Sequence, residues 1–407
     1  MDVNLNDYNK VRILSNGSTS KVYLYEHKET KNPIIFKSYC VNGFKNSDTS
    51  HCFIQESSKL FSLYHPCILP IEGIVYDEKK SRILLGLKFA SNGTINNECI
   101  GNLSITSKYC ISLGIASALK YIKQKGVLHG KLSPNHVLLD NNNLPMICDF
   151  SFPKSSSIDV NRFSTISCLP YMSPEIINGS SLESSKSDVF SFGLILYELL
   201  TNQSPFDKSA SPIQQAHSFS QGNRPPIPDT LNEFCRNLII NCWSNDPRDR
   251  PSPEELFQTL VENPKLFIND NDIKLAREYA KVLLDYDRDR VLSELGDPSG
   301  AYGYGKVLFN MSKSHHYSVL ALERIEFAAK RNINQAVTFL DGLKTKTSDL
   351  VLVDNHIETK DLKVHCPELV KAASLGNIEQ IKSLLIEDAD INTQNDEGVT
   401  FLIMIVL

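Results

Sequence analysis

The sequence lacks the cysteine patterns that bind zinc or cross-link small secreted domains. Its ten cysteines form no CxxC pair and no cluster with histidine at the spacing of a metal site. Scattered cysteines of this kind are typical of reduced, mostly buried thiols in a cytosolic protein. We therefore expect neither a disulfide framework nor a structural zinc ion.

The sequence also has little that would direct it to a membrane or a nucleic acid. The N-terminal stretch MDVNLNDYNK has no basic region followed by an apolar one, so it is not a secretory signal. No apolar run approaches the roughly 20 residues that span a bilayer. A net charge of −5 disfavours nucleic acids and anionic membranes as partners. We expect a cytoplasmic protein that binds other proteins, and we interpret the ending VTFLIMIVL as part of an unfinished core.

What the sequence does contain is a change of hydrophobic period. The first quarter places β-branched and aromatic residues between Gly, Asn and Pro, as in VRIL, KVYLYEH and NPIIFKSY, which predicts strands. From about Ser104 the apolar spacing becomes helical, at Tyr109, Leu113, Ala116, Leu119 and Ile122. The sequence therefore predicts an α+β fold, with a small β-rich lobe before a larger helical lobe.

Two later segments predict helices of different kinds. The run VFSFGLILYELL, from Val189, is apolar nearly all round and predicts a helix in the middle of a large domain. The segment SPEELFQTLVEN begins with Ser252 as an N-cap, Pro253 in the first turn and Glu255 completing a capping box.

A series of short motifs follows a fixed order through the first two thirds of the chain. They are ILSNGSTSKVY from Ile13, IIFK ending at Lys37, FASNGTI from Phe89, HGKLSPNHVLLD from His129, ICDFSF around Asp149, MSPE ending at Glu175, SDVFSFGLILYELLT from Ser187 and CWSNDPRDRP around Arg250. In order and spacing, residues 9–263 resemble a protein kinase of the tyrosine-kinase-like group. The resemblance implies a two-lobed fold with a β-rich N-lobe and a helical C-lobe.

The resemblance also implies ATP and Mg²⁺ as cofactors and assigns positions to them. These are Gly17 and Val22 in the glycine-rich loop, Lys37 with its helix partner Glu56, Phe89 at the hinge, Leu138 beneath the adenine and Asp149 at the metal. Lys37, Glu56 and Asp149 favour residual nucleotide binding. Ser15 and Ser20 in place of glycines, and Ile35 in place of a small alanine, oppose it. Both outcomes stay open at this point.

The catalytic loop departs from the kinase pattern at the positions that transfer phosphate. Lys131 replaces the aspartate that accepts the substrate proton, Ser133 the lysine that steadies the γ-phosphate, and His136 the asparagine that holds a second magnesium ion. An ammonium has no acceptor site, and imidazole is a poor ligand for Mg²⁺. Such a loop normally opens toward substrate, so we do not expect the burial that would make Lys131 a base.

The positions that hold the kinase frame are kept. The resemblance implies that Asp188 binds the backbone of the catalytic loop and that Glu175 pairs with Arg250. With the frame kept and no catalytic residue intact, we predict a pseudokinase that acts as a scaffold or allosteric partner. The alternative is a serine/threonine kinase of low activity that uses an unconventional base.

The remainder of the chain predicts helices and repeats. Residues 264–290 form an expected linker helix. Residues 291–345, with Ala301 and Ala336 in register, resemble a Sel-one-like repeat, although an ordinary helical extension is the alternative. A linker at 346–365 precedes residues 366–407, which resemble an incomplete ankyrin repeat. These segments are further surfaces for protein partners.

Overall fold

The structure is a computed structural model of the chain. It describes residues 3–16, 20–40, 60–77, 82–95, 97–151, 168–179, 184–267, 273–311 and 315–343. The chain divides into two compact units, Met1–Asp285 and Tyr286–Leu407. The predicted linker at 346–365 and the ankyrin-like segment at 366–407 lie outside the described residues.

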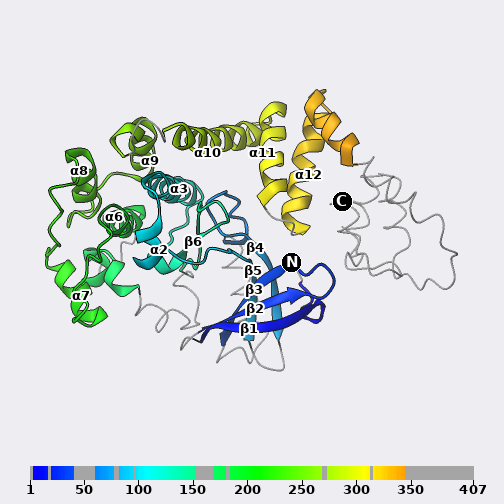
Figure 1. Cartoon of the computed structure of the whole chain (residues 1–407). Coiled ribbons are helices and arrows are strands. Elements are labelled where there is room, and N and C mark those ends of the chain that lie inside the picture. Colours follow the sequence, from blue (N-terminus) through cyan, green and yellow to red (C-terminus); the bar gives the residue numbers. More distant parts are fainter. Residues whose placement is uncertain are drawn as a thin grey trace. The chain divides into compact units, whose positions relative to one another are not determined.

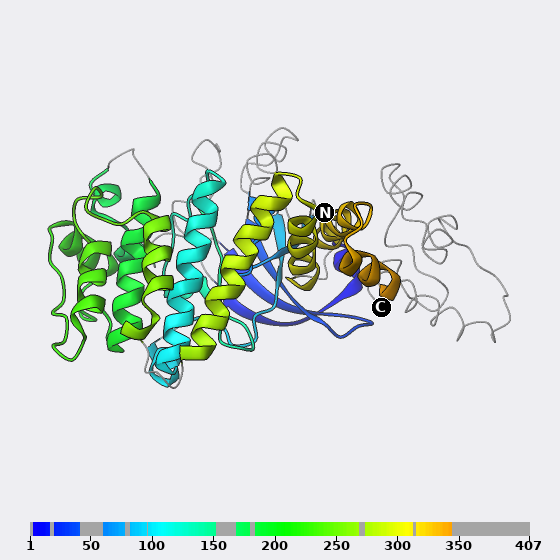
Figure 2. The ribbon, with the colours of Figure 1, turned by 90° about the horizontal axis from the view of Figure 1, so that it is seen from above.

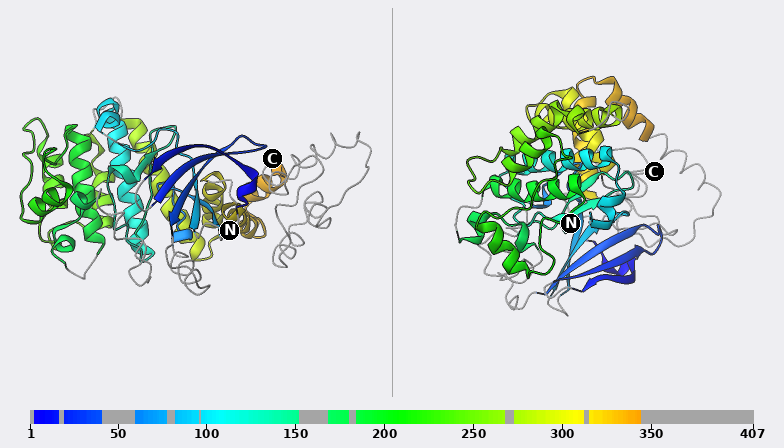
Figure 3. Two further views of the ribbon diagram at one scale, coloured as in Figure 1. Left: turned by 90° about the horizontal axis from the view of Figure 1, so that it is seen from below. Right: turned by 60° about the vertical axis from the view of Figure 1, so that its left-hand side comes forward.

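An antiparallel sheet of five strands forms the N-terminal lobe, as the first quarter of the sequence predicts (Figures 1 and 3). The strands are β1 (Tyr8–Asn16), β2 (Ser20–His27), β3 (Pro33–Cys40), β4 (Ile71–Asp77) and β5 (Arg82–Lys88), in the order β1-β2-β3-β5-β4. Side chains alternate between the faces of a strand. On β3, Ile34 and Phe36 are buried, so Ile35 and Lys37 share the opposite face.

The second lobe is built around two buried helices. Helix α3 (Ile105–Gln124) begins after the N-cap Ser104, and the five apolar residues predicted to face the core are each at most 1% exposed. Helix α6 (Ser185–Thr201) is buried over most of its length, as predicted. Around them lie α2 (Asn97–Asn102), α5 (Pro174–Ile177), α7 (Pro212–Ser220), α8 (Glu233–Cys242) and α9 (Pro253–Glu262), with the short strands β6 (Val137–Leu139) and β7 (Pro145–Ile147).

The capping box predicted at Ser252 is present at the start of α9. The Ser252 hydroxyl accepts from the Glu255 amide at 3.2 Å, and the Glu255 carboxylate accepts from the Ser252 amide at 2.7 Å. A local sequence signature therefore fixed this helix start, because each group pairs with a residue only three positions away.

The predicted ion pair between Glu175 and Arg250 is also present. The guanidinium donates to both carboxylate oxygens at 2.7 and 2.8 Å, and Arg250 is 1% exposed. Arg250 Nε also donates to the carbonyl of Ser244 at 2.8 Å. This bidentate pair joins the segment at α5 to the loop before α9, and burial makes both partners depend on it.

The predicted linker helix is α10 (Ile273–Glu294), and its first half packs into the core of the helical lobe. Tyr279 and Leu283 join the cluster formed by α3 and α9, which lie beside α10 in Figure 2. The Tyr279 hydroxyl lies 3.2 Å from Cys67 Sγ. A Cβ at Gly114 of α3 would lie 2.6 Å from that hydroxyl and 2.5 Å from Pro145. The close approach of α10 therefore requires glycine at 114.

The second unit contains the end of α10 with α11 (Pro298–Met311), α12 (His315–Ala329) and a helical segment at 334–343. Ala301 and Ala336, which the sequence places in register, are both fully buried in one apolar cluster. The helices are as expected, and the identity of the repeat stays a prediction. In neither unit is any helix of the described residues long and apolar enough to cross a membrane.

Replacing Arg250 should destabilise the protein. We expect Arg250→Met to lower the free energy of unfolding by about 3 kcal/mol, because it leaves the carboxylate of Glu175, whose side chain is 14% exposed, without its cation. Arg248→Met is the matched control, since Arg248 pairs with Asp246 in an exposed position. Chemical denaturation of both variants measures the difference. Equal stability of the two would contradict the role given to the buried pair.

Gly114→Ala should also destabilise the fold, by the roughly 1–3 kcal/mol typical of an overpacked core. The added methyl group meets Pro145 and Tyr279. Gly101→Ala in α2 is the control, because a Cβ there meets nothing within 4 Å. Thermal unfolding of both variants tests whether α10 packs as described, and an unchanged melting temperature for Gly114→Ala would show that it does not.

Candidate functional site

The catalytic-loop segment is held by the start of α6. Asp188 accepts hydrogen bonds from the backbone amides of His129 and Gly130, both at 2.9 Å, which confirms the role predicted for it. Gly130 has φ +69°, and a Cβ there would stand 2.7 Å from Ser151 Oγ. The left-handed backbone and the nearby serine together explain glycine at this position.

Asp149 lies at the centre of a cluster of nitrogen donors. Its Oδ1 lies 2.5 Å from Lys37 Nζ, and its Oδ2 lies 3.1 Å from His136 Nε2. The three side chains come from β3, from the loop after β7 and from a 3-10 helix at Pro134–His136. All three are 13–15% exposed. Sequence reasoning placed these residues at one site, and the structure brings them into direct contact.

His136 makes a second contact on the other side of its ring. Its Nδ1 lies 2.6 Å from the carbonyl oxygen of Lys131 and 3.3 Å from Ser133 Oγ. A carbonyl only accepts, so Nδ1 donates to it. Sequence reasoning treated His136 only as a lost metal ligand and missed this bridge between the loop and Asp149. The sequence signal for this contact was a basic residue, His136, at a position that the kinase pattern places near Asp149.

Lys131 is buried, contrary to the expectation that its loop opens toward substrate. The residue is 4% exposed. Burial lowers the pKa of Lys131, the Asp149 carboxylate opposes that shift, and the charge of Lys37 adds to it. The expectation was wrong because tertiary packing, which one motif does not encode, decides the exposure of this side chain.

The electrostatics of Asp149 follow from these neighbours. Burial alone would raise the pKa of its carboxyl, but the charge of Lys37 and the contact with His136 hold the pKa well below its usual range. Lys131 acts in the same direction. Asp149 is therefore an ionised carboxylate at neutral pH, and its charge is balanced by the protein itself.

His129 is fully buried behind this cluster and packs against Phe150, with ring centroids 4.6 Å apart. Burial lowers the pKa of His129 to about 3, and the neighbouring His136 acts in the same direction. The imidazole is therefore neutral at physiological pH. It serves as an apolar and hydrogen-bonding part of the frame.

Leu138, the residue predicted to lie beneath an adenine, packs against an apolar cluster. Leu87 and Leu138 pack against buried Leu69, Ala90 and Met146, and Cys148 of the same cluster directly precedes Asp149. Phe89 is half-buried directly after β5. Ile35 pairs in register with Leu24 on β2 and Leu87 on β5. A cluster of apolar side chains thus lies next to Asp149 in the sequence. Ile35, which is larger than alanine, is paired with Leu87 of this cluster in the sheet.

Some predicted residues are not placed by the structure. Gly17 and Glu56 lie outside the described residues, so the predicted pair between Lys37 and Glu56 stays a prediction. Val22 is described and stands opposite Lys37 in the register of β2 and β3. Among the described residues, no group of three or more histidine, cysteine, aspartate and glutamate side chains could hold a metal ion.

The described residues do not fit the Mg²⁺ that the resemblance implies. Mg²⁺ requires oxygen ligands in near-octahedral geometry. Both oxygens of Asp149 are already in contact with nitrogen donors, and the position of the second ligand carries an imidazole. A metal ion here would have to displace Lys37 and His136 and would then lie beside the Lys37 ammonium group.

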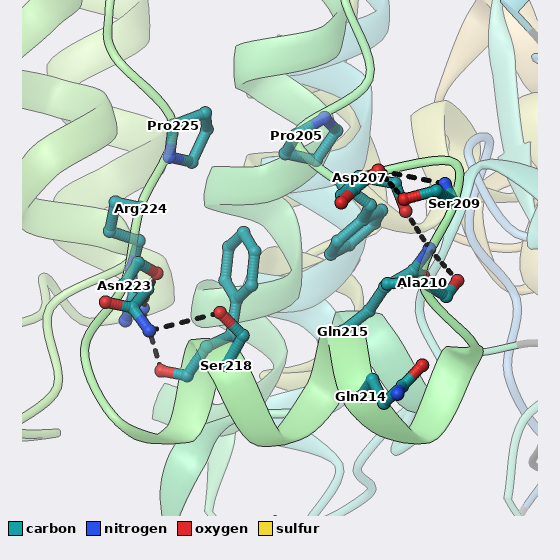
Figure 4. Close-up of a pocket in the computed structure, with 12 residues that line it drawn as sticks. Pro205, Asp207, Ser209, Ala210, Gln214, Gln215, Ser218, Asn223, Arg224 and Pro225 are labelled. Atoms are coloured by element: carbon teal, nitrogen blue, oxygen red, sulfur yellow. Dashed lines mark hydrogen bonds between the residues drawn. The ribbon is translucent and has the colours of Figure 1, made fainter.

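A separate hollow of about 540 Å³ lies in the helical lobe, between α7 and the segment at 223–225 (Figure 4). Its polar groups bind one another. Asn223 donates to Ser218 at 3.1 Å, and Arg224 donates to the carbonyls of Phe219 and Trp243, both at 2.8 Å. Burial lowers the pKa of Arg224 to about 10, so it remains charged. The guanidinium thus joins α7 to the end of α8 as part of the frame.

Comparisons with known proteins identify nearly the same region, residues 9–263, that the sequence motifs cover. Residues 8–261 match the protein kinase domain family. The probable serine/threonine-protein kinase CCRP1 of Zea mays is 28% identical over 256 residues, which cover 62% of this chain and 40% of the relative. Human mitogen-activated protein kinase kinase kinase 7 is 28% identical over 242 residues, 57% of this chain and 39% of the relative. This chain thus spans less than half the length of these relatives.

The dual specificity protein kinase splA of Dictyostelium discoideum is also similar, with 26% identity over 241 residues. That region covers 54% of this chain and 10% of the relative. In all three relatives the similarity lies in a region about the size of the kinase-like lobes.

The buried His129 should make stability depend on pH. Its folded pKa of about 3 lies below its usual 6.5, so its contribution is complete above pH 6.5 and is lost as the pH falls toward 3. One such group changes the free energy of unfolding by about 1.4 kcal/mol per pH unit in that window. We expect His129→Leu to have a shallower slope between neutral and mildly acidic pH than the wild type.

The exposed His217 on α7 provides the control for this measurement. His217→Leu should keep the slope of the wild type in urea denaturation at several pH values. Identical slopes for wild type and His129→Leu would mean that His129 is not held neutral by burial.

Proposed function

This chain belongs to the protein kinase family, and from that premise we propose that it is a pseudokinase. In this proposal the two lobes serve as a binding scaffold or allosteric partner for another protein and do not transfer phosphate. The kinase frame supplies a rigid surface, and the catalytic cluster supplies its stability.

The observation that carries the proposal is that a buried lysine, Lys131, occupies the position of the catalytic base. A catalytic base must accept the proton of the substrate hydroxyl, and a protonated lysine has no acceptor site. The side chain of Lys131 is buried, and its carbonyl oxygen is bound by His136. Phosphoryl transfer depends on positioning and on metal ions that neutralise charge, and Asp149 already forms an ion pair with Lys37 and contacts His136.

The contrast between frame and chemistry supports the same proposal. Asp188 still binds the loop backbone, and the pair between Glu175 and Arg250 is bidentate. Random loss of sequence constraint would affect these positions as readily as the catalytic ones. The structural residues are kept while the phosphate-transfer residues are replaced. This pattern favours the interpretation that the fold is maintained for binding.

One observation favours the second candidate, a serine/threonine kinase of low activity. Burial lowers the pKa of Lys131, which moves the lysine toward the neutral amine that could accept a proton. The charge of Asp149 opposes that shift. The names of the relatives are compatible with either candidate. The absence of a carboxylate at position 131 places the pseudokinase first.

The kinase group, the repeats after the kinase domain and the cellular location are also proposals. Membership of the tyrosine-kinase-like group rests on SDVFSFGLILYELLT and CWSNDPRDRP. The Sel-one-like repeat at 291–345 and the ankyrin-like segment at 366–407 would offer additional surfaces to protein partners. Scattered cysteines and the mildly acidic charge support a cytoplasmic location.

Purified full-length protein should incorporate no phosphate into itself or into generic protein substrates with MgATP. The reason is that position 131 carries a lysine and that, among the described residues, the carboxylate of Asp149 is already in contact with Lys37 and His136. The measurement is incorporation of labelled phosphate from γ-labelled ATP, with Lys37→Met as the control for contaminating kinases. Incorporation that disappears in Lys37→Met would refute the proposal.

The triple variant Lys131→Asp, Ser133→Lys and His136→Asn extends this test. It restores the residue types that the family pattern has at these positions. Incorporation by this variant above that of the wild type would support the loop as the cause of inactivity. If the wild type is active and Lys131→Met abolishes that activity, Lys131 is the base of the second candidate.

A further inference from the structure

Strand β1 forms one edge of the five-stranded sheet (Figure 1). Among the described strands it pairs with β2 alone, and residues 9–16 make no backbone hydrogen bond to the described residues outside that pairing. Alternate N–H and C=O groups of an edge strand point away from the sheet, where they can pair with another extended chain. At nine residues, β1 is also longer than the typical strand of about five to six residues.

The side chains of β1 include large apolar groups in contact with water. Every residue from 9 to 16 is exposed, and the exposed fractions of Val11 and Ile13 are 53% and 52%. The register shifts between Lys10 and Arg12, so Val11 has no partner residue on β2. Bulges and charged residues commonly protect an edge from pairing. Here the bulge adds an exposed valine, so the edge keeps an apolar surface that another chain can cover.

The charged side chains of β1 have one sign. Lys10 and Arg12 are its only charged residues, and the stretch 9–16 contains no acidic residue. The neighbouring strand β2 has one acidic residue, Glu26, and it contacts Lys31 at 3.7 Å. The edge is therefore basic, although the chain as a whole has a net charge of −5.

From these observations we infer that β1 is a docking edge for an extended, acidic segment of a protein partner, which adds to the sheet as a further strand. Backbone hydrogen bonds supply affinity in this mode of binding, and the side chains supply specificity. Opposite charges across a strand pair are favourable, and like charges are unfavourable. A second copy of the chain is a poorer occupant, because it would place two basic strands against each other.

The inference rests on the proposed binding role of the lobes, for which it names a surface and a class of partner. The two fail separately. Phosphate incorporation tests the loss of transfer at the catalytic cluster, and peptide binding tests the edge of the sheet, whether or not the protein transfers phosphate.

The probe is a capped synthetic peptide of alternating valine and glutamate, with nine residues to match β1. We expect fluorescence anisotropy to show that it binds the full chain, with an affinity that falls as the salt concentration rises. A peptide of alternating valine and lysine tests the charge. A valine–glutamate peptide with alternate backbone amides methylated tests the hydrogen bonds. Both should bind more weakly, and equal binding by either one, or no binding by the probe, would overturn the inference.

Variants of β1 locate the binding surface. Arg12→Glu should weaken binding of the valine–glutamate peptide about threefold or more and strengthen binding of the valine–lysine peptide, because it reverses a cross-strand charge pair. Ile13→Thr should weaken binding of both by removing exposed apolar surface. Lys208→Glu makes the same change of net charge at an exposed residue before α7 and is the control. Equal effects of Arg12→Glu and Lys208→Glu would contradict the inference.

Analytical ultracentrifugation of the full chain tests the competing occupant. We expect no dimer that depends on β1. A dimer that Ile13→Thr dissociates would show that the edge binds a second copy of the chain, and it would overturn the assignment of an acidic partner.

Discussion

The carboxylate of Asp149, shared between Lys37 and His136, is the interaction on which the character of this site depends. A buried charge is stable only when it is paired and hydrogen-bonded. In this chain both carboxylate oxygens are paired by protein nitrogens, at 2.5 and 3.1 Å. The loop that carries Lys131 therefore has Asp149 as a counter-charge, and His136 of the same loop contacts that carboxylate. In the pseudokinase that we propose, this carboxylate is retained for electrostatic balance.

The rest of the kinase-like fold holds this cluster in place through contacts that do not depend on catalysis. Asp188 binds two successive amides of the loop, and Arg250 binds Glu175 in a bidentate pair. His129, neutral and buried, packs on Phe150 directly after Asp149. Each of these interactions stabilises the lobe whether or not phosphate is transferred. A binding surface can thus be maintained while the catalytic positions change.

Much of this was predictable from the sequence, and the remainder depended on tertiary contacts. The apolar spacing from Tyr109 to Ile122 and the capping box at Ser252 are local patterns, so they predicted α3 and the start of α9 correctly. The motif around His129 identified the loop. The burial of Lys131 could not be predicted, because it depends on which distant groups pack against the loop. The second contact of His136, with the carbonyl of Lys131, depends on the backbone conformation of the loop, which the motif does not specify. The packing of α10 on Gly114 is likewise a contact between residues far apart in the sequence.

We propose that contacts with Lys37 and His136 occupy the carboxylate that would otherwise bind the metal, and electron paramagnetic resonance of Mn²⁺ tests this most directly. Mn²⁺ takes the same oxygen ligands as Mg²⁺ and has a spectrum that changes when a protein binds it. With the full chain and ATP, we predict the spectrum of Mn²⁺ in solution with ATP, without a protein-bound component. A protein-bound Mn²⁺ signal that disappears in Asp149→Asn would contradict the claim.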